Sequence, residues 1–107
     1  MQTWDIASLD VQPHQPEVLR TDPEARVIAI NLPAGELLQE HQVHERAWVV
    51  IAAGEVEIDQ EGSTVSGGPG LVAHFDPKEP HELRATSDAR VLLFLAPWPG
   101  EGHPNLR

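Results

Sequence analysis

Residues 46–59 read Arg-Ala-Trp-Val-Val-Ile-Ala-Ala-Gly-Glu-Val-Glu-Ile-Asp and predict two β-strands joined by a tight turn. In residues 55–59 apolar and acidic side chains alternate, so Val56 and Ile58 are expected to face a core while the acids face water. Residues 48–51 are apolar at every position, which is typical of a central strand covered on both faces. Between the two strands, the Ala-Gly pair suits a hairpin turn because glycine readily adopts positive φ.

Similar short runs recur along the whole chain at intervals of about 8–12 residues, separated by clusters of Gly, Pro and Asp. No segment carries a sustained 3.6-residue apolar period with helix caps. This pattern indicates an all-β sandwich or barrel. The expected strands are 27–32, 46–51, 55–59, 63–66, 71–75, 82–85 and 91–95, preceded by short edge strands around 4–6 and 17–21.

The composition narrows the functional classes. With 107 residues the chain is expected to form a single domain with one modest core. Its net charge of −10 repels phosphate backbones, which argues against nucleic-acid binding. There is no apolar run long enough to cross a membrane and no recognisable secretory signal. The chain has no cysteine, which fits a cytoplasmic protein and leaves only histidine and carboxylate side chains to hold a metal.

Histidine is the residue type in this chain that is best suited to bind a metal or to take part in catalysis, and the chain has six histidines. His14 and His103 lie in proline-rich terminal segments and are expected at the solvated surface. His74 alternates with Val72, so it faces the core if Val72 does, and its ring nitrogens then need a metal, a carboxylate or a carbonyl as partner. The others in or beside the middle strands are His41, His44 and His81.

Two segments of the chain resemble the motifs of the cupin family. Gly35-Glu-Leu-Leu-Gln-Glu-His41, followed by Ala53-Gly54-Glu55, is similar to the first motif. Gly70, followed by Asp76-Pro-Lys-Glu-Pro-His81, is similar to the second. The resemblance implies a double-stranded β-helix, or jelly-roll barrel, in which histidines and a glutamate hold a divalent metal, with His41 and His81 at ligand positions. It also implies a homodimer.

The resemblance covers residues 26–96 and implies a domain organisation for the chain. A single cupin domain is expected over 1–107, with N-terminal edge strands in 1–25 and an irregular tail over 97–107. Within that tail, Trp98 is flanked by prolines and is expected to cap a pocket or to pack on a neighbouring subunit. In the middle of the chain, Trp48 opens an apolar strand and is expected in the core.

Two ligand positions of the family carry side chains that cannot bind a metal here, Val43 and Ala47. The neighbouring His44 and Glu45 are the candidate replacements. In a regular strand only one of them points inward, and His44 shares the face of His41 only if a bulge intervenes.

Three hypotheses for function follow. The first is a metal-dependent enzyme of dioxygenase or isomerase type acting on a small organic molecule, with Zn, Ni, Fe, Mn or Cu as the metal. The second is a non-catalytic barrel that binds a small molecule or a metal, and the third is a folding and dimerisation module. Whether the chain is an enzyme stays open. In the first hypothesis Glu45 or Glu40 is the general base, and the metal ligands are His41 and His81 with one or both of His44 and His74.

Overall fold

The computed structural model describes residues 1–40 and 43–102. These residues form nine β-strands, and no helix is found among them. It follows that they contain no helix that could span a membrane. The strands are β1 (Glu17–Thr21), β2 (Arg26–Leu32), β3 (Leu37–Glu40), β4 (Arg46–Ala53), β5 (Val56–Gln60), β6 (Ser63–Gly67), β7 (Val72–Phe75), β8 (His81–Ala85) and β9 (Ala89–Ala96).

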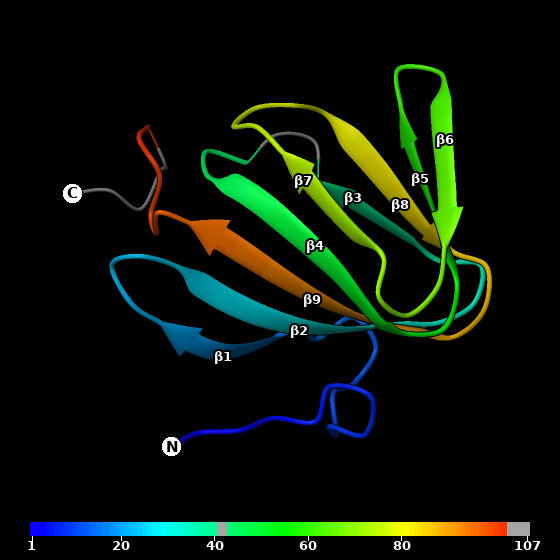
Figure 1. Ribbon diagram of the computed structural model, residues 1–107, viewed down its shortest axis with the longest axis horizontal. Coiled ribbons are helices and arrows are strands. Elements are labelled where there is room, and N and C mark those ends of the chain that lie inside the picture. Colours follow the sequence, from blue (N-terminus) through cyan, green and yellow to red (C-terminus); the bar gives the residue numbers. More distant parts are fainter. Residues whose placement is uncertain (41–42, 103–107) are drawn as a thin grey trace.

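The strands form two antiparallel sheets that enclose the core (Figure 1). The larger sheet has the order β1-β2-β9-β4-β7, and the smaller has the order β3-β8-β5-β6. Figure 1 also shows the β5–β6 hairpin extending beyond the neighbouring strands. Since β7 and β6 each end a sheet, they are edge strands on the same side of the molecule. The architecture is therefore a barrel with seams between its two sheets.

Strict alternation in the central strands produces the core. In β9 the side chains of Val91, Leu93 and Leu95 are buried, and the residues between them are only half-buried. The register sets Leu95 opposite Ala47 and Leu93 opposite Val49, so the inner faces of β9 and β4 coincide. On the facing sheet, the buried apolar side chains come from β5 and β8 in the same way. Each fully buried aliphatic side chain contributes about 1.5–3 kcal/mol, and this packing holds the two sheets together.

Most of the strand predictions are confirmed, with shifts of one or two residues at the ends. The expected edge strand at 17–21 is β1. The expected strand at 4–6 is wrong, because these residues lie in an irregular N-terminal segment. One strand, β3, was not predicted from the sequence. Its four residues are too few to display an alternation, and it forms only by pairing with β8.

Trp48 is not a core residue, and the sequence-based expectation is wrong. Its side chain is 46% exposed. In an extended strand it alternates with Ala47 and Val49, and those two smaller side chains occupy the inner face. Trp48 lies instead on the outer face of the larger sheet, where its cross-strand neighbours are His74 and Phe94.

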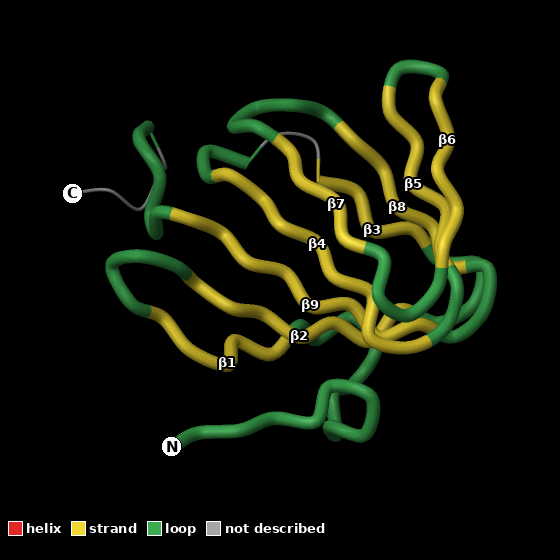
Figure 2. Tube along the Cα trace, in the orientation of Figure 1, coloured by secondary structure: helices red, strands yellow, loops and turns green. Residues whose placement is uncertain are grey.

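The N-terminal segment before β1 runs along the outside of the barrel (Figure 2). It buries Val11, whose carbonyl oxygen accepts a 2.9 Å hydrogen bond from Asn31 Nδ2 on β2. The guanidinium of Arg90 on β9 donates to the carbonyl oxygen of Leu9. Side chains of the larger sheet thus fix the segment through its backbone.

Candidate ligand-binding site

One end of the barrel is formed by residues 43–45, the loop between β7 and β8, and the C-terminal residues 97–102. The backbone N–H of Lys78 in the loop donates a 2.8 Å hydrogen bond to the carbonyl oxygen of Val43. The N–H of Gly100 donates a 2.7 Å hydrogen bond to Oε2 of Glu45. These contacts bring three segments, distant in sequence, together at one mouth of the barrel.

Glu45 is among the most buried side chains of the described residues, with 1% exposure. Its carboxylate holds the tail, and the tail must approach closely, because a Cβ on Gly100 would lie 2.2 Å from the backbone oxygen of His44. The chain therefore needs a glycine at this position. Of His44 and Glu45, the two candidate replacement ligands, Glu45 is the more deeply buried. Its hydrogen bond to Gly100 anchors the tail.

Trp98 is a second anchor of the tail. Its side chain packs against the buried core, and the guanidinium of Arg26 lies 4.1 Å from its ring centroid. Its backbone N–H donates a 3.4 Å hydrogen bond to the carbonyl oxygen of Pro23. The tail over 97–102 has no regular secondary structure. It is fixed at this end of the barrel, at Trp98 and again at Gly100.

His81 lies inside the barrel. Its side chain is 9% exposed and stacks on Phe75, with ring centroids 3.7 Å apart and an angle of 4° between the planes. Nδ1 lies 3.1 Å from the carbonyl oxygen of Glu79. Because a carbonyl can only accept, Nδ1 carries the proton in this contact, and in the neutral ring Nε2 keeps its lone pair. The cross-strand partner of Phe75 is Ala47, one of the two positions that lack the family's ligand.

Of the four candidate metal ligands, the structure describes His44, His74 and His81, and these three do not form one cluster. His41 lies outside the described residues, and of Glu40 only the backbone is described. His44 is half-buried beneath the tail, where a Cβ on Gly102 would lie 3.4 Å from its Nδ1.

His74 lies on β7 beside Trp48, with ring centroids 4.6 Å apart and an interplanar angle of 58°. The condition for an inward His74 fails, since Val72 is 53% exposed. The pair thus lies on the outer face of the larger sheet, and His81 lies on the inside.

A divalent metal needs at least three protein donors in one place if the site is to resemble the known metal centres. Within residues 1–40 and 43–102, no three His, Asp or Glu side chains are grouped closely enough to hold one. At the mouth, Val43 and Ala47 offer no donor, and the Glu45 carboxylate is bonded to the tail. The described residues alone thus do not complete a metal centre of the usual kind, and His41 lies outside them.

The larger cavity of the barrel is a groove of about 300 Å³ between β7 and the β5–β6 hairpin. It is open because β7 and β6 end their sheets and are not paired with each other. Val65 on its wall is 54% exposed, although it points to the same side of the hairpin as buried Ile58. The apolar lining comes from Ile58, Val65, Leu71, Val72, Ala73 and Phe75. The groove therefore reaches Phe75, which stacks on His81.

The polar side chains of this groove are Gln60, Ser63 and His74. Nε2 of Gln60 donates a 2.6 Å hydrogen bond to Oε2 of Glu79 and also lies 3.4 Å from the carbonyl oxygen of Pro80. The other carboxylate oxygen of Glu79 accepts a 2.7 Å hydrogen bond from the backbone N–H of Asp76. These contacts join the groove to the loop that carries His81. Sequence reasoning missed this groove, since no local pattern reveals which strands end the two sheets.

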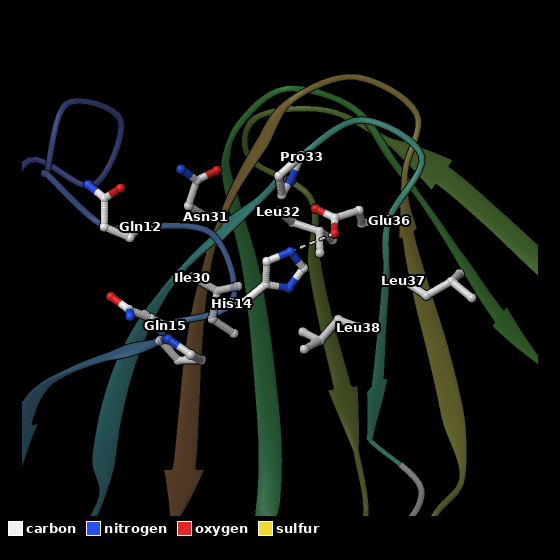
Figure 3. Close-up of a pocket in the computed structure, with 11 residues that line it drawn as sticks. Gln12, His14, Gln15, Ile30, Asn31, Leu32, Pro33, Glu36, Leu37 and Leu38 are labelled. Carbon is white, nitrogen blue, oxygen red and sulfur yellow. Dashed lines mark ion pairs between the residues drawn. The ribbon is translucent and has the colours of Figure 1, made fainter.

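A smaller cavity of about 90 Å³ lies on the other side of the barrel, between β2, β3 and the N-terminal segment (Figure 3). Nε2 of His14 lies 2.9 Å from a carboxylate oxygen of Glu36, which ties the segment to the turn before β3. His14 is exposed, as expected, and its ring closes over the cavity.

Two arginines at the surface have raised pKa values. The hydrogen bond and charge of Asp22 raise the pKa of Arg20, and those of Glu57 raise the pKa of Arg84. Neither arginine lines either of the two cavities.

Taken together, two antiparallel sheets around a buried histidine define a small jelly-roll barrel. The sequence of residues 28–97 matches the cupin domain family, so the chain belongs to that family. The resemblance recognised in the two motifs is thereby confirmed, as is the jelly-roll fold. No protein of curated function matches the chain.

Solved structures show the same fold at low sequence identity. An RmlC-like cupin protein from Desulfovibrio desulfuricans is 21% identical with a TM-score of 0.78, over 91% of this chain and 97% of that one. KdgF from Halomonas sp. is 18% identical with a TM-score of 0.72, over 83% and 85%. The Cupin_2 domain of an XRE family transcriptional regulator from Enterobacter cloacae is 22% identical with a TM-score of 0.67, over 76% and 93%.

Proposed function

We propose that the protein binds a small organic molecule in the groove between β7 and the β5–β6 hairpin, next to Phe75. The observation that carries this proposal is the groove itself, which is the larger cavity and leads from solvent to a core aromatic ring. Ligand sites are typically concave and mostly apolar, with a few fixed polar groups. This groove has that composition, and its volume lies at the small end of the usual range.

The proposal is tested by filling the groove. The probe is 4-methylphenol, and binding is followed by the ¹H–¹⁵N spectrum of the labelled protein. In Val65→Trp the larger side chain occupies the groove, and we expect affinity to fall at least about tenfold, a loss of about 1.4 kcal/mol. Val18→Trp is the matched control, because Val18 is an exposed valine on the opposite edge strand of the larger sheet. Equal binding by both variants contradicts the proposal.

A second candidate function is the metal-dependent enzyme, of dioxygenase or isomerase type, acting on a small molecule. The observation that favours it is the contact from Nδ1 of His81 to the carbonyl oxygen of Glu79. Metal-binding histidines usually donate their second N–H in this way, which directs the other nitrogen to the metal. In this candidate His41 and His81 hold a divalent transition metal, with His44 as a further ligand and Glu45 as the base.

Metal analysis of untagged protein separates the two candidates. A stoichiometric metal that is lost from His41→Ala and from His81→Ala supports the enzyme. Full metal occupancy in both variants would contradict a metal site formed by His41 and His81. A folded, metal-free protein that still binds 4-methylphenol leaves the groove as the functional site.

We also propose that the protein is a homodimer. Support comes from the outer face of β4, β7 and β9, where Trp48 and Val72 are exposed next to half-buried Val50, Leu92 and Phe94. Apolar residues gathered on one face are common at subunit contacts. Light scattering tests this proposal, with a dimer expected for the native protein and a monomer for Trp48→Glu. A native monomer contradicts it.

A further inference from the structure

We infer that the groove selects an uncharged molecule that has an apolar body and one hydrogen-bond donor, and that Gln60 Oε1 accepts from this donor. The inference rests on the proposed function and adds to it the chemical class of the ligand. Three observations carry it: the orientation of the Gln60 amide, the lack of lysine and arginine among the described residues that line the groove, and the lack of Asp and Glu among the same residues.

The orientation of the Gln60 amide follows from its partners. One amide atom lies 2.6 Å from the Glu79 carboxylate and 3.4 Å from the carbonyl oxygen of Pro80. Both partners are acceptors only, so the atom that faces them must be the NH₂ group. The carbonyl oxygen, Oε1, is then what Gln60 can offer to a molecule in the groove. An acceptor of fixed orientation selects a hydroxyl or an N–H.

The charges around the groove disfavour an anion. Among the described residues that line it there is no lysine or arginine, and His74 at the rim is the one titratable side chain. The protein as a whole carries a net charge of −10, which adds repulsion. A ligand carboxylate that entered the groove would also lose its hydration and lie against an apolar wall without a charged partner, and this desolvation costs free energy.

A cation is disfavoured for a different reason. Glu79 is the carboxylate next to the polar end of the groove. One of its oxygens already accepts from Gln60, and the other accepts from the backbone N–H of Asp76. Each oxygen keeps a further lone pair, but Glu79 is not among the residues that line the groove, so an ammonium group there would leave water without a carboxylate as partner. A neutral donor such as a hydroxyl avoids this cost and reaches Oε1 of Gln60 instead.

Four probes that share one apolar body test the inference: 4-methylphenol, 4-methylanisole, 4-methylbenzoate and 4-methylbenzylamine, which is cationic at pH 7. Affinities are measured on the 107-residue chain by titration of its ¹H–¹⁵N spectrum. We expect 4-methylphenol to bind about 3–10-fold tighter than 4-methylanisole, the effect of one hydrogen bond. The two charged probes are expected to bind at least about tenfold more weakly than 4-methylphenol.

The role of Gln60 is tested with Gln60→Leu. The variant should bind 4-methylphenol about 3–10-fold more weakly and leave 4-methylanisole unchanged, so that the two affinities converge. Gln15→Leu is the matched control, because Gln15 lines the smaller cavity on the other side of the barrel. If Gln60→Leu fails to fold, the ranking of the four probes on the native protein still decides the question.

The failures of the two proposals are distinguishable. If none of the four probes binds, the proposed function fails and the selectivity falls with it. If the probes bind in the groove but 4-methylbenzoate or 4-methylbenzylamine binds tightest, only the inferred ligand class is overturned. Equal binding of 4-methylphenol and 4-methylanisole by the native protein overturns the role of Gln60.

Discussion

The barrel has a seam on each side, and the two seams differ. On the side of β2 and β3, the N-terminal segment covers the seam and leaves a cavity of about 90 Å³. On the side of β6 and β7, no described segment covers the seam, and a groove of about 300 Å³ remains. The same chain thus closes one gap between its sheets and leaves the other open. The difference supports the proposal that a ligand enters at the open seam.

The mouth of the barrel strengthens this comparison. The tail is anchored at this end, with Gly100 hydrogen-bonded to Glu45 and Trp98 packed against the core. Phe75, which stacks on His81 inside the barrel, forms part of the wall of the groove. Each of the following substitutions alters one of these three regions, in order of decreasing expected effect on stability.

Phe75→Ala is expected to lower the free energy of unfolding by about 3–5 kcal/mol, because it leaves a cavity in the core and removes the ring that stacks on His81. Urea denaturation measures this loss. Phe75→Leu keeps most of the volume and should cost less than about 1.5 kcal/mol. Similar costs for the two variants would show that the ring is not closely packed.

Glu45→Ala is expected to lower the free energy of unfolding by about 1.5–3 kcal/mol, since it removes a charged acceptor and leaves the buried N–H of Gly100 without it. Hydrogen exchange at the Gly100 amide should accelerate at the same time. Glu101→Ala, an exposed neighbour in the tail, is the control and should change stability by less than about 0.5 kcal/mol. An unchanged exchange rate at the Gly100 amide in Glu45→Ala would contradict the anchoring of the tail by Glu45.

Asn31→Ala examines the covered seam. It removes the hydrogen bond that fixes the carbonyl of Val11, and the free energy of unfolding should fall by about 0.5–1.5 kcal/mol in a urea titration. Binding of 4-methylphenol should be unchanged, because this contact lies on the opposite side of the barrel from the groove. A loss of binding in this variant would mean that the two seams are not independent.

His14→Ala should have the smallest effect, below about 0.5 kcal/mol. The ion pair with Glu36 is exposed, and ion pairs at the surface contribute little. The change is measured by the same urea titration as for Asn31→Ala. A cost larger than that of Asn31→Ala would show that the ion pair, and not the buried backbone contact, holds the segment in place.

The all-β class and the cupin family were predictable because they depend on local signals. Alternation in residues 55–59 and the positions of glycine and proline are properties of short segments, and they persist in the folded chain. At Gly54, for example, φ is +77° and a Cβ would lie 2.1 Å from the carbonyl oxygen of Asp88, so the turn requires glycine. The expected hairpin at this turn is wrong, however, because β4 belongs to the larger sheet and β5 to the smaller one.

The site was harder to predict because it depends on how distant strands are ordered. Because successive side chains of a strand point to opposite faces, either Trp48 or Ala47 faces inward. The size of the apolar side chain favours Trp48, but in the structure Ala47 is the buried one. The groove exists because β6 and β7 end their sheets, a fact of topology that no segment of sequence carries. Glu45 could be singled out as a site residue, but its bond to Gly100 joins residues 55 positions apart.

The central claim is that a small molecule enters through the open seam and not through the mouth. The most direct measurement is a map of backbone amide shifts in the native protein on titration with 4-methylphenol. We predict that the largest shifts fall on Ile58, Val65 and Ala73, which line the groove. The largest shifts on Val43, Ala47 and Gly100, at the mouth, would contradict the account.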